Sequence, residues 1–212
     1  MKKLLLVLCA VMIVFCVTGS ASANFFIDFE DGLDGAFVND ITGVSFKDFN
    51  GYDSIYGDSR TGKYNTTSDD LGYGHGSYHH NGNFWLWAGP NADARGVIID
   101  FTSDDGTWFE TGYSSSSEFN VEAFLTDGTM VTVAGAGNTN SPMDYLRIEA
   151  TAGLFIDYLV LHDAGNHWLV DDMSGDASGV GPVVPEPSTI LLLGAGFLGL
   201  VGYSRKRLSK KS

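Results

Sequence analysis

The sequence predicts an all-β fold, an antiparallel β-sandwich with a targeting segment at each end. Nine short segments are rich in aromatic or β-branched residues, and many of them alternate between apolar and polar positions. No segment between the two ends shows a helical apolar period over three turns, and the 27 glycines of the chain suit many turns. The nine segments are residues 24–30, 44–49, 84–88, 96–102, 118–126, 130–134, 145–150, 155–162 and 167–173. Asp127-Gly128, between two of them, predicts a tight hairpin.

The N-terminal segment, residues 1–23, has the three parts of a secretory signal peptide. Two lysines precede an apolar run over residues 4–17, and Ala21 and Ala23 place small side chains where signal peptidase reads them. We therefore expect export through the secretion machinery and cleavage before Asn24. Both cysteines of the chain lie inside this segment, so the mature protein has no disulfide.

The segment between the two ends is long enough for one domain. Residues 24–184 number 161, and we assign 24–176 to the β-sandwich and 177–184 to a linker. This segment carries five basic residues against 25 acidic ones, a formal charge of −20. Such a surface repels phosphate backbones, so the composition excludes a nucleic-acid-binding function.

The C-terminal segment, residues 185–212, has three parts in a fixed order. Pro185, Glu186 and Pro187 come first, and the two prolines hold the glutamate in an extended, accessible conformation. Residues 189–203 follow without a charge; they are fewer than the roughly 20 that usually span a bilayer. The basic residues of 204–212 come last; their side chains can snorkel to the headgroups and favour the cytoplasmic side. We predict a short transmembrane helix over 189–203.

This arrangement resembles the PEP-CTERM sorting signal of surface proteins from Gram-negative bacteria, over residues 184–211. The resemblance implies that an exosortase, a membrane-embedded cysteine peptidase, processes the chain near Pro185, Glu186 and Pro187. It implies a membrane-anchored precursor that is then delivered to the cell surface or the extracellular space. It also implies an association with exopolysaccharide or biofilm matrix, which is the function that we expect.

Two acidic segments stand at the ends of the predicted sandwich. Glu30 and Asp31 close the first strand, and Asp171 and Asp172 lie in the last. They resemble the opening and closing segments of jelly rolls of the carbohydrate-binding-module type. That resemblance implies a jelly-roll-like sandwich with neighbouring first and last strands, and a structural calcium held by these four carboxylates, since calcium takes six to eight oxygens. The alternative is that the carboxylates face solvent.

An aromatic segment, residues 51–89, suggests glycan binding as an alternative function. Flat rings flanked by amides and hydroxyls bind sugars by stacking on their C–H faces. The candidate residues are Tyr73, Tyr78, Trp85 and Trp87. Because side chains alternate along a strand, one face of residues 84–88 is expected to be core, which leaves one tryptophan face free.

No constellation in the sequence predicts catalysis. Gly57-Asp58-Ser59 resembles the nucleophile block of SGNH hydrolases, but Asp163 and His167 are one residue too far apart for the partner block of that family. We interpret residues 55–62 as a turn and expect no catalytic residue, so the protein is not predicted to be an enzyme.

Overall fold

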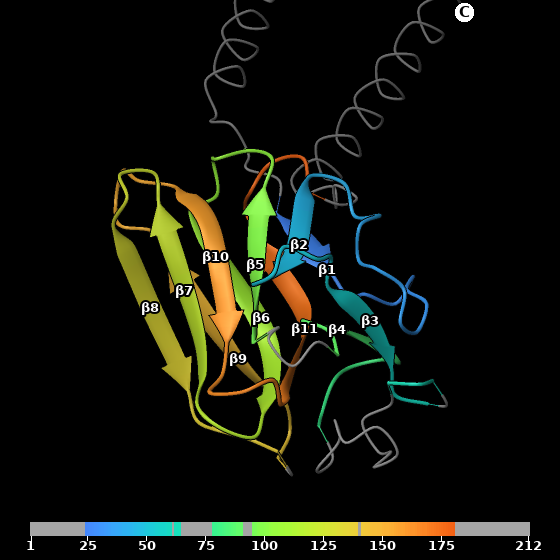
Figure 1. Cartoon of the computed structure of the whole chain (residues 1–212). Helices are drawn as coiled ribbons and strands as arrows, with labels where there is room; N and C mark the ends of the chain where they lie inside the picture. The colour runs from blue at the N-terminus through green and yellow to red at the C-terminus, as the bar shows by residue number, and fades with distance from the viewer. Residues whose placement is uncertain (1–23, 61, 65–77, 91–94, 140, 181–212) are drawn as a thin grey trace, which may run out of the picture.

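The computed structural model describes residues 24–60, 62–64, 78–90, 95–139 and 141–180, which form two antiparallel sheets packed face to face (Figure 1). One sheet has the order β3-β4-β11-β6-β9, with β1 also beside β11, and the other has the order β2-β5-β10-β7-β8. The strands are β1 (Phe25–Ile27), β2 (Val44–Asp48), β3 (Ile55–Asp58), β4 (Phe84–Trp87), β5 (Gly96–Phe101), β6 (Trp108–Ser115), β7 (Phe119–Leu125), β8 (Met130–Gly135), β9 (Asp144–Glu149), β10 (Ile156–His162) and β11 (Trp168–Gly175). The predicted all-β sandwich is confirmed.

The core lies between the sheets because alternate side chains of each strand point inward. In β7, Val121, Ala123 and Leu125 are buried, and the residues between them are partly exposed. Tyr113 of β6 stacks on Phe119 of β7 with ring centroids 5.0 Å apart, so aromatic pairs join the two sheets. The core holds without disulfides, since neither cysteine lies in the described domain.

Two local predictions are confirmed. Asp127-Gly128 joins β7 to β8, with the Gly128 amide donating to the Leu125 carbonyl at 2.8 Å and with φ of 82° at Gly128. That positive φ is the reason for a glycine here. The first and last strands are also neighbours, since β1 pairs with β11 in antiparallel register.

The interpretation of residues 55–62 as a turn is wrong, because Ile55–Asp58 forms strand β3 and pairs with β4. All four residues of β3 are buried, so the period-2 pattern that marks a half-exposed strand is absent. Strand β6 was not predicted either. It lies between β11 and β9, and its Glu, Thr, Gly and Ser residues conceal it because the surrounding strands, rather than its own composition, fix its conformation.

The packed domain continues past residue 176, the predicted boundary. Ala177 and Val180 are buried, and a Cβ at Gly43 would overlap the carbonyl of Gly179. The predicted signal peptide with Ala21 and Ala23, the sorting triplet Pro185-Glu186-Pro187 and the predicted helix over 189–203 lie outside the described residues. In the part of the chain that the structure describes, no helix is long and apolar enough to cross a membrane.

Candidate functional site

Strand β11 changes its neighbour halfway along one edge. Val170 pairs with Leu86 of β4, whereas Met173 pairs with Ile27 of β1. On the other edge, the register with β6 shifts between Asp171 and Ser174, which marks a β-bulge. Asp172 lies in this bulge with a backbone φ of 49°, a conformation that residues other than glycine rarely adopt. We call this place the strand junction and define it by Glu30, Asn81, Asn83, Asp171 and Asp172.

Glu30 joins the end of β1 to the beginning of β4. One of its carboxylate oxygens accepts hydrogen bonds from the backbone amides of Asn83 at 2.7 Å and Phe84 at 2.8 Å. A Cβ at Gly82 would overlap this carboxylate, and Gly82 has φ of 61°, so only glycine fits there. Burial alone would raise the pKa of Glu30, but the hydrogen bonds from Phe84 and Asn83 outweigh it, and the pKa is lowered.

Asp171 is fully buried at the same junction. Its carboxylate accepts hydrogen bonds from the amides of Asn81 at 2.9 Å and Asp172 at 2.7 Å. Burial raises the pKa of Asp171 to about 8, and the negative charges of Asp172 and Glu30 add to the effect. Asp172 accepts from the Tyr145 hydroxyl at 2.9 Å and from the Asn81 side-chain amide. The carboxylates of Asp171 and Asp172 therefore link strand β11 to two other chain segments, those of Asn81 and Tyr145.

The junction brings together three of the four residues predicted to bind calcium, Glu30, Asp171 and Asp172. The fourth, Asp31, lines a cavity beside Tyr56 instead. Among the described residues, no group of three or more His, Cys, Asp or Glu side chains is arranged to hold a metal ion. The junction carboxylates accept N–H and O–H hydrogen bonds, and calcium binding by them stays a prediction.

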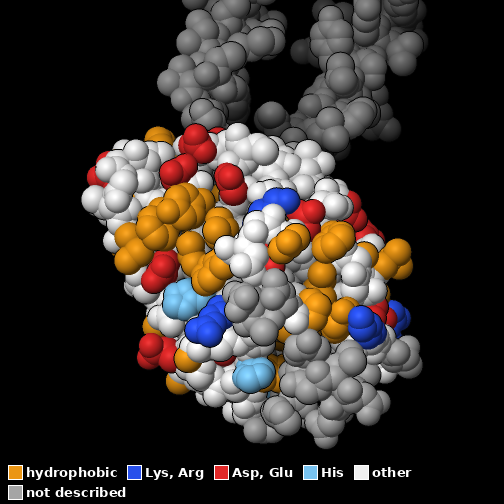
Figure 2. Space-filling view, in the orientation of Figure 1, with side chains coloured by type: hydrophobic (Ala, Val, Ile, Leu, Met, Phe, Trp, Pro, Cys, Tyr) orange, Lys and Arg blue, Asp and Glu red, His pale blue; other side chains and the backbone are white. Residues whose placement is uncertain are grey.

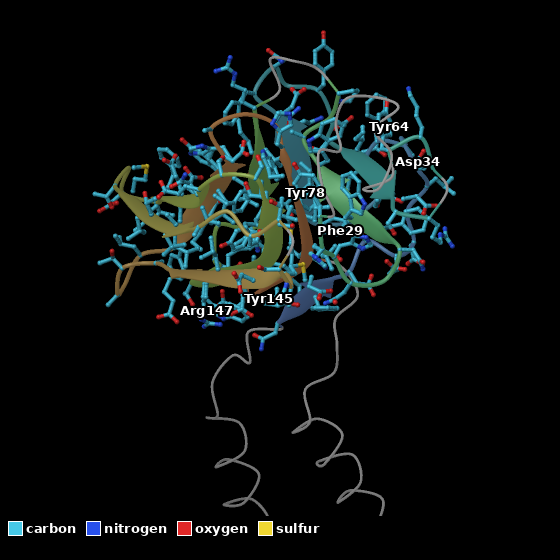
Figure 3. The ribbon with its side chains drawn as sticks, turned by 90° about the horizontal axis from the view of Figure 1, so that it is seen from below. Phe29, Asp34, Tyr64, Tyr78, Tyr145 and Arg147 are labelled. Atoms are coloured by element: carbon cyan, nitrogen blue, oxygen red, sulfur yellow. The ribbon has the colours of Figure 1, made fainter. Side chains whose placement is uncertain are left out.

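The predicted glycan-binding aromatics of the described chain are part of the packed structure. Tyr78, Trp85 and Trp87 are 7%, 6% and 3% exposed, so the expected free tryptophan face is not present. Tyr64 packs against Trp87, with the two ring centroids 5.9 Å apart. Asp34 accepts a hydrogen bond from the Tyr64 amide and so holds Tyr64 in place (Figure 3). Tyr73 lies outside the described residues.

A different pair of rings is accessible on the outer face of the β2-β5-β10-β7-β8 sheet. Phe124 of β7 lies opposite Tyr158 of β10, and their rings stack with centroids 4.5 Å apart at 10°. Both side chains are partly exposed, and Met130 of β8, opposite Phe124, is 50% exposed. Figure 2 shows the resulting hydrophobic patch over β7 and β10. We call it the Phe124–Tyr158 face.

Polar side chains border this face at positions fixed by strand register. Asp100 of β5 lies opposite Tyr158, and Glu122, two residues before Phe124, approaches His162 of β10 at 3.6 Å. Burial raises the pKa of Asp100, as do the charges of Asp157 and Asp104. Phe124 and Tyr158 are 34 positions apart in the sequence, so only the β7-β10 pairing brings them together. A period-2 analysis of both strands could have placed each on an outer face, but not beside the other.

The C-terminal part of the chain is similar to a known protein family. Residues 183–207 match the model for the PEP-CTERM protein-sorting motif. The chain carries a PEP-CTERM sorting motif. The match includes Pro185, Glu186 and Pro187 together with the apolar segment that follows. The PEP-CTERM motif marks an exported protein that an exosortase processes for delivery to the cell surface.

Solved structures resemble the domain only distantly. The K2 cleaved adhesin domain of Lys-gingipain is 14% identical, with a TM-score of 0.44 over 73% of this chain and 98% of that one. A family 29 carbohydrate-binding module from Piromyces equi, CBM29_1, is 10% identical, with a TM-score of 0.37 over 73% of this chain and 92% of that one. No curated protein matches the chain significantly.

Proposed function

We propose that this PEP-CTERM chain is a non-catalytic component of the cell surface or the extracellular matrix that binds polysaccharide. Its Phe124–Tyr158 face is the proposed binding surface. The observation that carries the proposal is a stacked aromatic pair, partly exposed on the outer face of a β-sheet and bordered by hydrogen-bonding side chains. The sorting motif supports the location, since a protein delivered to the surface meets exopolysaccharide there.

The face has the two features that sugar binding needs. Its rings offer apolar area for the C–H faces of pyranose rings, while Asp100, Glu122 and His162 can exchange hydrogen bonds with hydroxyls. A polymer lying across the strands would meet Met130, Phe124 and Tyr158 in one row. Because the domain carries a formal charge of −20, we expect neutral polysaccharides to bind better than polymers rich in uronic acids.

The surroundings of Ser59 support a non-catalytic role. The Ser59 hydroxyl donates to the Asn83 carbonyl at 3.3 Å, and the neighbouring Asp58 carboxylate is paired with Arg60 at 2.8 Å. The serine thus closes the β3–β4 ladder, and the aspartate is occupied by an arginine rather than by a catalytic histidine.

Affinity electrophoresis in gels containing the exopolysaccharide of the producing organism tests the proposal. We expect the exported domain to be retarded, and we expect Tyr158→Ala and Phe124→Ala each to weaken retardation at least tenfold. Tyr52→Ala is the matched control, because Tyr52 is 64% exposed and lies outside the face. Equal retardation of Tyr158→Ala and wild type would overturn the assignment of this face.

A further inference from the structure

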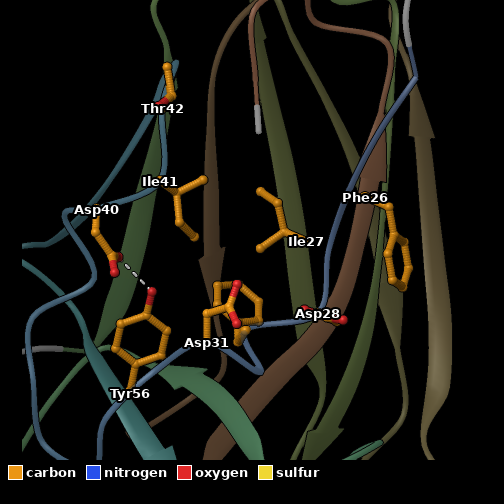
Figure 4. Close-up of a pocket in the computed structure, with 9 residues that line it drawn as sticks. Phe26, Ile27, Asp28, Asp31, Asp40, Ile41, Thr42 and Tyr56 are labelled. Carbon is orange, nitrogen blue, oxygen red and sulfur yellow. Dashed lines mark hydrogen bonds between the residues drawn. The ribbon is translucent and has the colours of Figure 1, made fainter. Parts of the chain in front are cut away.

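A cavity of about 430 Å³ lies between the chain after β1 and the segment that leads into β2 (Figure 4). Its lining combines Ile27 and Ile41 with Asp31, Asp40 and Tyr56, and it also includes Asp28. We call it the Tyr56 cavity. It shares no residue with the Phe124–Tyr158 face, and its volume suits one or two sugar rings.

The polar side of the cavity is held in place by a hydrogen bond. The Tyr56 hydroxyl donates to Asp40 Oδ1 at 2.7 Å. Burial raises the pKa of Tyr56, and the hydrogen bond with Asp40 and the charges of Asp40 and Asp31 raise it further, so the hydroxyl stays protonated. Asp40 is thereby oriented, while its second oxygen and the exposed Asp31 carboxylate remain open to a ligand. Gly32 supports this arrangement, because a Cβ there would overlap the Tyr56 ring.

The negative charge of the cavity carboxylates is not paired with a basic side chain among the described residues. No lysine, arginine or histidine of the described ranges forms an ion pair with Asp28, Asp31 or Asp40, although four such pairs form elsewhere in them. The same carboxylates are not arranged as a group of three that could hold a metal ion. An ammonium group can satisfy the charge instead, because it donates charge-assisted hydrogen bonds to separate carboxylates without a closed coordination shell.

The opposite side of the cavity is apolar. Ile27 and Ile41 point toward each other across it (Figure 4), and Ile27 is only 6% exposed. These side chains offer contact area to the C–H face of a ring, while the carboxylates stand beside Tyr56. The cavity therefore fits a molecule with an apolar face and a positive charge at one edge.

We propose that the Tyr56 cavity binds an amino sugar whose amine is free, with the ammonium on Asp31 and Asp40 and the ring against Ile27 and Ile41. The inference rests on the proposed function in taking the ligand to be a matrix sugar. It names a substrate class, partly deacetylated amino-sugar polymers, that the Phe124–Tyr158 face does not select.

Isothermal titration of the exported domain with a glucosamine trisaccharide tests this inference, with the N-acetylglucosamine trisaccharide as the ligand control. We expect the free amine to bind at least tenfold more tightly, and its affinity to fall with added salt and as the pH rises past the pKa of the amine. Asp40→Asn and Asp31→Asn should each weaken binding at least tenfold. Both substitutions are nearly isosteric, and unchanged melting temperatures would show that the variants remain folded.

Glu118→Gln is the matched protein control, because it removes one exposed carboxylate at the turn before β7. Equal affinity for the two trisaccharides, or an equal loss in Glu118→Gln and Asp40→Asn, would overturn the inference, since either result indicates non-specific attraction to an acidic domain. Tyr158→Ala separates the two proposals. If Tyr158→Ala abolishes polysaccharide retardation while it still binds the glucosamine trisaccharide, both proposals stand. If the wild-type domain is retarded by polysaccharide but does not bind the glucosamine trisaccharide, the cavity proposal fails and the proposed function remains.

Discussion

The hydroxyl of Tyr145 donates a hydrogen bond to Asp172 at 2.9 Å, although Tyr145 lies on β9 and Asp172 on β11, with β6 between the two strands. The β-bulge makes this contact possible. With φ of 49°, the backbone at Asp172 turns its carboxylate toward Tyr145 and Asn81, while the preceding Asp171 remains buried. The strained residue is thus held by partners from two other chain segments.

Substitutions at Asp172 separate backbone strain from hydrogen bonding. Asp172→Ala and Asp172→Gly both remove the carboxylate, but only glycine tolerates the positive φ. We expect Asp172→Ala to be less stable than Asp172→Gly by about 1 kcal/mol in urea unfolding. Tyr145→Phe isolates the hydroxyl and should cost about 1 kcal/mol relative to wild type. Identical unfolding curves for the alanine and glycine variants would show that the bulge relaxes.

The buried Asp171 predicts an unusual dependence of stability on pH. Its pKa is about 8 in the folded protein and about 4 in an unfolded chain, so the folded state binds the proton more tightly. The contribution of Asp171 to the free energy of unfolding is full below pH 4. It is lost as the pH rises to 8, by roughly 1 kcal/mol per pH unit. Urea midpoints between pH 4 and 8 measure it, and Asp171→Asn should flatten this slope. A slope that persists in Asp171→Asn would assign it to other groups.

Glu30 contributes to the pH dependence of stability with the opposite sign to Asp171. Because its pKa is lowered in the folded protein, its contribution is present above the unfolded value of about 4.3 and is lost as the pH falls through the folded value. Glu30→Ala leaves the amides of Asn83 and Phe84 without their acceptor, and we expect a loss of about 2–4 kcal/mol in unfolding free energy. Glu30→Gln keeps one carbonyl oxygen and should lose less than half of that; equal losses would point to charge rather than hydrogen bonding.

Gly57 allows β3 to approach Trp85, because a Cβ at this position would overlap the indole ring. Gly57→Ala must displace the buried ring, so we expect a loss of about 1–3 kcal/mol in unfolding free energy. Gly165→Ala is the control, since its nearest neighbouring atom lies 3.8 Å from the added Cβ. That variant should stay within about 0.5 kcal/mol of wild type. Similar losses for both variants would contradict a specific overlap with Trp85.

Calcium at the strand junction stays a prediction of the sequence, and thermal unfolding tests it. The sequence-based expectation is a melting temperature that rises with calcium and falls in chelator. Asp172→Asn serves as the comparison, because it removes one predicted ligand charge at a position where asparagine also tolerates positive φ. Superimposable melts with calcium and with chelator would show that hydrogen bonds alone hold the junction.

Much of the fold could be predicted because its signals are local. Alternation of apolar and polar residues predicted strands such as β7, and Asp127-Gly128 predicted the hairpin between β7 and β8. Strand β3 was not predicted because burial on both faces removes the alternation from Ile55–Asp58. Strand β6 was not predicted because neighbouring strands impose an extended conformation on its polar sequence. The neighbouring positions of β1 and β11 came from a resemblance at their acidic ends, and their pairing confirms them.

The candidate sites depended more on tertiary structure. Trp85 and Trp87 are residues typical of a sugar-binding surface, yet both are buried, Trp85 over Gly57 and Trp87 against Tyr64. Phe124 and Tyr158, which carry no signal as a pair, meet because β7 and β10 are adjacent. Glu30 and Asp31 are neighbours in sequence, yet one joins the strand junction and the other lines the Tyr56 cavity.

By itself, the sequence determined where this protein goes and which kind of fold it adopts. A sorting motif is read as a linear segment, and strand alternation repeats every two residues, so both are visible without coordinates. Only the tertiary structure decided which aromatic rings are exposed and which carboxylates share a site. Burial and juxtaposition depend on strand order and register, and these bring together residues that are far apart in the chain.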